Sequence, residues 1–79
     1  MVIKRWETDR RYYVCDLHQD LLGDWVLHQY WGGKFNKMGS QSMKLARSYQ
    51  NAQDEIDQLH KVRVKRGYHL IEGADHELL

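Results

Sequence analysis

The chain has 79 residues, which limits it to one domain with a thin core, since a protein of this size buries only roughly 60% of its unfolded surface. Its formal net charge is +1, so overall charge alone gives no reason to expect a nucleic-acid partner. The single cysteine excludes an internal disulfide, and no apolar stretch approaches the roughly 20 residues that span a bilayer. Because the first residues also lack the apolar core of a signal peptide, we expect a cytoplasmic protein of bacterial or phage origin.

Five segments have the composition or the alternation of β-strands. They are residues 3–6, 10–17, 25–31, 40–45 and 68–71. We expect the first to lie at an edge of the sheet, and the second and third to form an antiparallel hairpin around a turn at residues 20–24. Gly23 suits that turn because glycine adopts a positive φ without strain. Gly32 and Gly33 are expected to end the third strand.

Side chains at every second position of a strand share one face of the sheet. The alternation therefore predicts that Tyr13, Cys15 and Leu17 share one face of the second strand. It places Trp25, Leu27 and Trp31 on one side of the third. In the fourth strand, Met43 and Leu45 are the candidates to face the core. Because Cys15 lies within such a strand, we interpret it as a small buried hydrophobe and not as a reactive thiol.

The clearest helix signal lies between Ser48 and Gly67. Apolar residues repeat there at spacings of three and four, which gives one apolar stripe: Tyr49, Ala52, Ile56 and Leu59. Either Ser48 or Asn51 can cap the start of this helix, and Gly67 suits the position just past its end. Together the elements predict an α+β fold, a twisted antiparallel β-sheet with one α-helix packed across one face. We expect this domain to occupy residues 1–72 and a flexible tail to follow at residues 73–79.

Charge is distributed along the chain in blocks, so a nearly neutral protein can still carry local basic faces. Residues 31–50 contain no acidic side chain, and their cations are the best candidates for binding phosphate: Lys34, Lys37, Lys44 and Arg47. Arg11, Lys65 and Arg66 can extend the same surface. The alternative is that these residues are only solvated loop and helix faces, with the last two complementing the helix dipole.

The most distinctive short segment is Trp31-Gly32-Gly33. Glycines beside an aromatic ring allow a nucleotide backbone to approach closely, so Trp31 can serve as a stacking platform for a sugar or a base. The spacing equally permits Trp31 to be a core residue and the glycines to be a hairpin turn. Tyr30 points to the opposite face of the strand, so at most one of the two rings is expected to be buried.

The sequence contains no pattern that is typical of a catalytic or metal site. None of its five histidines pairs with another histidine or with Cys15 at ligand spacing, and no zinc pattern is present. Asp57 and His60 are three residues apart on the predicted helix, where they are simple surface neighbours. We therefore expect no enzymatic activity, no metal and no other cofactor.

Taken together and in order, the aromatic and glycine landmarks resemble the WGR domain, a tryptophan-glycine-arginine module of poly(ADP-ribose) polymerases and small bacterial proteins. The matching positions are Arg11-Tyr12-Tyr13, Asp20-Leu21-Leu22-Gly23-Asp24-Trp25, Leu27, Trp31-Gly32, Gly39, Ala52 and Lys65-Arg66-Gly67-Tyr68. The resemblance covers residues 3 to 70 and implies an antiparallel sheet with one helix, no catalytic activity and a role in binding nucleic acid. It also implies that Trp31 is the family tryptophan, which contacts DNA at strand breaks in the polymerases.

This chain departs from the family pattern at Gly33, which stands where the family has its arginine. In the polymerases that arginine helps to link DNA contact to neighbouring domains. Lys34 and Lys37 lie in the same loop, so a cation can still reach a phosphate.

We therefore expect a stand-alone module that contacts DNA ends, nicks or backbone. The residues expected at the interface are Trp31, Gly32, Gly33, Lys34, Lys37, Lys44, Arg47, Arg11, Tyr30, Lys65 and Arg66. The alternative, favoured by the low net charge and the missing arginine, is a protein-interaction adaptor or a small homodimer without affinity for nucleic acid.

Overall fold

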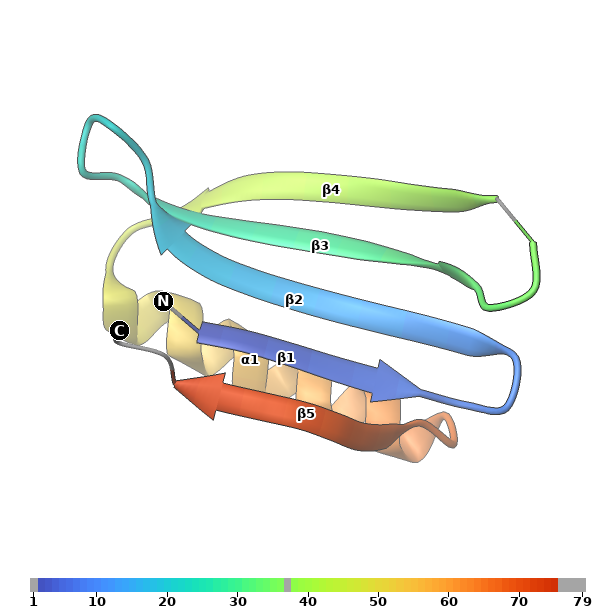
Figure 1. Ribbon diagram of the computed structural model, residues 1–79. Coiled ribbons are helices and arrows are strands. Elements are labelled where there is room, and N and C mark those ends of the chain that lie inside the picture. Colours follow the sequence, from blue (N-terminus) through green and yellow to red (C-terminus); the bar gives the residue numbers. More distant parts are fainter. Residues whose placement is uncertain (1, 37, 76–79) are drawn as a thin grey trace.

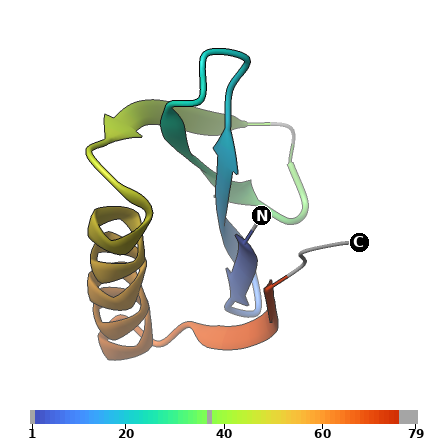
Figure 2. The same cartoon turned by 90° about the vertical axis from the view of Figure 1, so that its left-hand side faces the viewer.

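The computed structural model describes residues 2–36 and 38–75 (Figure 1). The elements follow in the order β1 (Val2–Glu7), β2 (Arg11–Gln19), β3 (Trp25–Gly33), β4 (Gly39–Ala46), α1 (Tyr49–Lys65) and β5 (His69–Asp75). The five strands form one antiparallel sheet in the order β4-β3-β2-β1-β5. The helix covers one face of the sheet and leaves the other face open (Figure 2). The predicted α+β fold is confirmed.

The first strand lies inside the sheet, between β2 and β5, so the prediction of an edge strand at residues 3–6 is wrong. The reason is the length of β5, which continues to Asp75 and pairs with β1 along its whole length, from Val2 opposite Asp75 to Glu7 opposite His69. The strand predicted at residues 68–71 is therefore too short, and β5 continues through residues 73–75, which we assigned to the tail. Residues 76–79 lie outside the described part of the chain.

The hairpin of β2 and β3 forms as predicted. Its turn is held by Asp20, whose Oδ1 accepts hydrogen bonds from the backbone N–H groups of Leu22 and Asp24, each at 2.9 Å. Gly23 has a φ of 85°, in the left-handed region that a side chain makes unfavourable.

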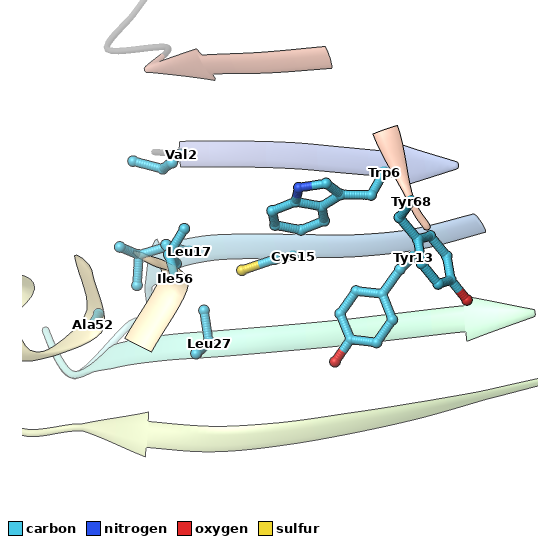
Figure 3. Close-up of a cluster of buried hydrophobic side chains, with 9 residues drawn as sticks. All are labelled: Val2, Trp6, Tyr13, Cys15, Leu17, Leu27, Ala52, Ile56 and Tyr68. Atoms are coloured by element: carbon cyan, nitrogen blue, oxygen red, sulfur yellow. The ribbon is translucent and has the colours of Figure 1, made fainter. Parts of the chain in front are cut away.

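The core lies between the sheet and the helix (Figure 3). Its buried members are Val2, Trp6, Tyr13, Cys15, Leu17, Leu27, Ala52, Ile56 and Tyr68. Figure 3 shows the aliphatic residues at one end of this cluster and the three aromatic residues at the other. The common face predicted for Tyr13, Cys15 and Leu17 is confirmed, and it is the buried face of the sheet, which Leu27 shares. Burial raises the pKa of the Cys15 thiol to about 12, so this cysteine stays protonated and has no nucleophilic role at neutral pH.

Both ends of the helix carry the expected signals. Ser48 is the N-cap, since its hydroxyl accepts a hydrogen bond from the backbone N–H of Asn51 at 3.0 Å. At the other end Gly67 has a φ of 91°, which confirms it as the terminating residue. This reversal brings Tyr68 into the core and starts β5.

The helix is attached to the sheet along its whole length. Near its start the ring of Tyr49 meets Trp25 edge to face, with centroids 4.9 Å apart. In its middle Ile56 is completely buried. Farther along, Nε1 of the buried Trp6 donates a hydrogen bond to Nδ1 of His60 at 3.0 Å. These contacts fix where the end of the helix lies relative to the strands, which positions the site described below.

The prediction that Met43 and Leu45 face the core is wrong, because they are 61% and 66% exposed. In the observed register they lie opposite His28 and Val26, on the open face of the sheet. A change of one residue in the assignment of faces moves every side chain of a strand to the other side. Ala46, at one of the inner positions of this edge strand, packs against the core instead.

Candidate nucleic-acid interface

A row of aromatic side chains crosses the sheet near one end. The strand register places Trp6, Tyr13 and Trp31 next to one another on β1, β2 and β3. Trp6 and Tyr13 pack edge to face with centroids 6.1 Å apart, and Tyr13 stacks on Trp31 at 5.5 Å with an interplanar angle of 8°. Trp6 is fully buried, whereas Trp31 is only partly buried. Trp31 is therefore the outer member of a row that leads from the core to the surface.

Arg63, near the end of α1, lies over this row. Its guanidinium carbon is 4.4 Å from the ring centre of Tyr13 and 5.0 Å from that of Tyr68, which are cation–π distances. Its Nε is buried and has no hydrogen-bond partner among the described residues. Burial raises the pKa of Tyr13, so the phenol stays neutral beside this cation. Arg63 is thus held by aromatic rings, and no ion pair within the described residues neutralises its charge.

These residues surround an open pocket, which we call the arginine pocket. It is lined by Arg11, Tyr13, Trp31, Arg63, Arg66 and Tyr68. Arg11 comes from the start of β2, Trp31 from the end of β3 and the other two arginines from the end of the helix. All of these segments meet at the end of the sheet drawn at the right of Figure 1. The pocket therefore combines a partly exposed tryptophan with three guanidinium groups and contains no acidic side chain.

Beside the arginine pocket lie three glycines, Gly32, Gly33 and Gly39, which we call the glycine saddle. Gly32 pairs directly with Gly39, and a Cβ on Gly32 would lie 2.7 Å from the backbone oxygen of Met38. Only glycine permits this close approach of β3 and β4. The strand includes both glycines and ends at Gly33, so they close β3 as expected, although its end lies two residues beyond the predicted Trp31.

Lys34, which we expected to compensate for the missing family arginine, is engaged in an ion pair. Its Nζ lies 2.7 Å from Oε1 of Glu7, and Oε2 of Glu7 lies 2.6 Å from Nε of Arg5. The hydrogen bond from Lys34, followed by that from Arg5, holds the pKa of Glu7 below its ordinary value. Lys34 is therefore less free to meet a phosphate than the arginines of the pocket.

The pairing of Glu7 predicts a pH dependence of stability. Because the pKa of Glu7 is lowered in the folded state, its stabilising effect is present above the ordinary value of 4.5 and is lost as the pH falls through the lowered folded value. Urea denaturation at neutral pH should show the Glu7→Gln variant to be less stable than the parent protein. This difference should shrink as the pH falls below 4.5. A difference that grows as the pH falls would contradict this assignment.

The other candidate cations do not gather at Trp31. Lys44 pairs with Glu55, with Nζ 3.0 Å from Oε1, and Arg47 follows the end of β4 that lies beside Trp25. Trp25 and Trp31 are separated by about 20 Å of extended strand, since each residue advances a strand by about 3.3 Å. Lys65 is exposed and is not one of the residues lining the arginine pocket.

The remaining two candidates are Tyr30 and Lys37. Tyr30 is on the open face, as predicted, and both it and Trp31 are partly exposed. Lys37 lies outside the described residues.

The sequence reasoning missed Arg63 as an interface residue, although a signal was present. The apolar stripe at Ala52, Ile56 and Leu59 reaches position 63 at its next step of four. A helical residue on this stripe faces the sheet whatever its charge. Continuing the stripe would therefore have placed the guanidinium of Arg63 against the aromatic row.

The described residues contain no group of three or more histidine, cysteine, aspartate or glutamate side chains placed to hold a metal ion. Within the same part of the chain, no helix is both long enough and apolar enough to cross a membrane.

Comparison with known proteins agrees with this arrangement. A family model for the WGR domain matches residues 2–75. No curated protein and no solved structure gives a match. The WGR domain is a non-catalytic module known from nucleic-acid-binding proteins. Because the match extends over nearly the whole chain and the fold agrees with it, the chain belongs to the WGR-domain family.

Proposed function

We propose that this WGR domain binds nucleic acid without catalysis, by contacting DNA ends or nicks through the arginine pocket. In this proposal Trp31 stacks on a sugar or base, while Arg11, Arg63 and Arg66 contact neighbouring phosphates. The observation that carries the proposal is the gathering of three arginines and no acid around a partly exposed tryptophan. Stacking on an aromatic ring beside cations is the usual way in which a protein holds exposed nucleotides.

The distribution of charge supports this orientation. The arginine pocket lies at one end of the sheet, whereas Asp20 and Asp24 lie in the turn at the opposite end of β2 and β3. A nearly neutral protein with opposite charge at its two ends can still steer a polyanion to its basic end. Guanidinium groups bind phosphate in a bidentate manner, so we expect recognition of the backbone and of end structure, not of base sequence along a duplex.

Trp31→Ala is expected to weaken binding by about 1–3 kcal/mol, the usual value of one base–aromatic stack. Fluorescence anisotropy of labelled nicked, blunt-ended and single-stranded DNA at two salt concentrations measures this change. If the three arginines each meet a phosphate, the log–log slope of affinity against salt should be about −3 on duplex DNA.

Trp25→Ala is the matched control for this variant. Trp25 lies on the same strand and face as Trp31 and is also partly buried, but it lies at the other end of β3. Its replacement should reduce stability and leave the affinity of the folded protein unchanged. Circular dichroism verifies that both variants are folded. An unchanged affinity in folded Trp31→Ala would refute the proposed contact.

A second candidate is self-association through the edge strand β4. Met43 and Leu45 are exposed there, and an edge strand presents unpaired backbone groups to a neighbour. Salt-insensitive self-association without any affinity for nucleic acid would favour this function. Light scattering that shows a monomer at high protein concentration would contradict it.

A further inference from the structure

A hydrogen bond joins the helix to the buried side of the sheet, from Nε1 of Trp6 to Nδ1 of His60 at 3.0 Å. Trp6 is completely buried, whereas His60 is only partly buried. The indole N–H can only donate a hydrogen bond, so Nδ1 of His60 has to accept it. A neutral imidazole meets this requirement when its proton is on Nε2. The contact therefore exists only while His60 is uncharged.

Protonation of His60 removes this acceptor, because the imidazolium carries a hydrogen on both ring nitrogens. The N–H of Trp6 would then be left without a partner in a place that water does not reach, which is unfavourable. We expect Trp6 or the adjoining turn of the helix to move until the indole N–H finds a new partner. Histidine takes up its proton between about pH 8 and pH 5, so this change falls in the physiological range.

Trp6 is the inner member of the aromatic row that supports the arginine pocket. It packs edge to face on Tyr13 (Figure 3), and Tyr13 in turn stacks on Trp31. Arg63 follows His60 by three residues, so the two are neighbours on one side of the helix. The guanidinium of Arg63 lies against the ring of Tyr13, and its Nε has no hydrogen-bond partner among the described residues. The position of Arg63 therefore depends on where the rings and this turn of the helix lie.

Charged and titratable side chains face His60 from its own helix and from the sheet. They are Asp57 and Arg63 of α1, Lys4 of β1, Tyr13 and Cys15 of β2, and Tyr68, which precedes β5. In the part of the chain that the structure describes, none of them forms an ion pair with His60. The hydrogen bond with Trp6 is therefore the contact that protonation changes directly.

We propose that His60 is a positioning residue of the interface. Its neutral ring holds Trp6, and through Trp6 the aromatic row and Arg63, in the arrangement that binds DNA. Protonation of His60 should therefore weaken binding, although His60 does not line the arginine pocket. This inference rests on the proposed function and adds to it a control by pH.

The expected direction is opposite to that of a general charge effect. Protonated histidines add positive charge, which by itself strengthens binding to a polyanion. His69 lines a pocket together with Arg10 and Arg11, so its protonation should act in this way. A loss of affinity that depends on His60 can therefore be distinguished from the charge of the other histidines.

The test is a pH profile of DNA binding between about pH 8 and pH 5, measured by fluorescence anisotropy for the parent protein and for His60→Asn. Asparagine places its Oδ1 near the position of the histidine Nδ1, so it keeps an acceptor for Trp6 and does not titrate. Both proteins should bind equally at the basic end of the profile. At the acidic end the parent should bind about threefold to tenfold more weakly than the variant, as loss of one hydrogen bond in the competent arrangement implies.

Two further variants serve as controls, and circular dichroism at each pH verifies that all of the proteins are folded. His60→Phe keeps a ring but has no acceptor, so it should bind weakly over the whole profile. His28→Asn removes a histidine of the open face, whose Nε2 lies 2.8 Å from Oε1 of Gln41. This variant should lose affinity at acidic pH as the parent does.

The outcomes separate this inference from the proposed function. If Trp31→Ala weakens binding but the affinity ratio of the parent to His60→Asn does not change with pH, the proposed function stands and the inference is refuted. A ratio that favours the parent at acidic pH also refutes it, since charged His60 would then act as a phosphate contact.

If no DNA binds at any pH, the proposed function fails, and nuclear magnetic resonance of the indole N–H groups decides the inference. The resonances of Trp6 and Trp31 should then move together as the pH falls in the parent protein and stay in place in His60→Asn. Trp25, at the other end of β3, is the internal reference. Resonances of Trp6 and Trp31 that do not respond to His60 would overturn the role assigned to this residue.

Discussion

Ile56→Ala is expected to lower the free energy of unfolding by about 2–5 kcal/mol. Ile56 is completely buried and belongs to the core cluster between the helix and the sheet (Figure 3). Removing its side chain takes apolar surface out of the core and leaves a cavity that the strands cannot fill. Domains are stable by only about 5–15 kcal/mol, and a domain with a thin core lies toward the lower limit. The variant should therefore be partly unfolded at temperatures at which the parent protein is still folded.

Urea denaturation followed by circular dichroism measures this effect, with Val62→Ala as the control on the same helix. Val62 is 40% exposed, so its replacement should change stability by less than about 0.5 kcal/mol. Because the helix carries Arg63 and Arg66, DNA binding by Ile56→Ala should fall in proportion to the unfolded fraction. Equal stabilities of the two variants would mean that the helix is not packed on the sheet as described.

The strands β2 and β3 were predictable because their signals are local in the sequence. These signals are the alternation of apolar side chains within each strand and the turn that joins the two strands. The length of β5 was not, since residues 72–75 have the composition Glu-Gly-Ala-Asp and carry no strand signal. They form a strand because β1 offers them a row of unpaired backbone groups. That pairing is formed between opposite ends of the chain, and for this reason β1 was misplaced at the edge.

Alternation in a strand shows which side chains share a face but does not identify the face. In β2 the strongly apolar Tyr13, Cys15 and Leu17 decide the question. In β4 either Met43 and Leu45 or Lys44 and Ala46 could face the core. Hydrophobicity favoured Met43 and Leu45, which the strand register places on the open face. The aliphatic part of a lysine can cover a helix-facing surface while its charge reaches a carboxylate, as Lys44 does with Glu55.

Of the residues that line the arginine pocket, the sequence identified Trp31, Arg11 and Arg66 as candidates. It did not indicate which other residues join them. Grouping cations by their proximity in sequence joined Lys34 to Arg47, which an extended strand carries to opposite ends of the sheet. The residues that do gather come from β2, β3 and the helix, so only the strand register and the helix position bring them together. The mixture of arginines and aromatic rings thus results from tertiary structure.

Gly33→Arg is expected to strengthen DNA binding by about tenfold or more and to steepen the salt dependence by about one unit of slope. Position 33 pairs with Arg11 and, by alternation, shares the face of Trp31. An arginine there would add a fourth cation beside the tryptophan and restore the family residue. Hydrogen bonds to charged groups contribute about 1.5–3 kcal/mol, which sets the size of the expected gain.

The backbone accepts this substitution, because the positive-φ glycines among the described residues are Gly23 and Gly67 and do not include Gly33. A Cβ at position 33 would meet Nδ2 of Asn36 at 2.5 Å, so that side chain has to turn away. Turning it breaks the hydrogen bond that Asn36 Oδ1 accepts from the backbone N–H of Met38, which costs about 1 kcal/mol of stability.

Gly33→Gln displaces the same side chain without adding charge, so it should show the stability loss without the gain in affinity. A gain in both variants would assign the effect to the loop and not to charge. Weaker binding by Gly33→Arg alone would contradict the prediction and would mean that the ligand does not reach position 33.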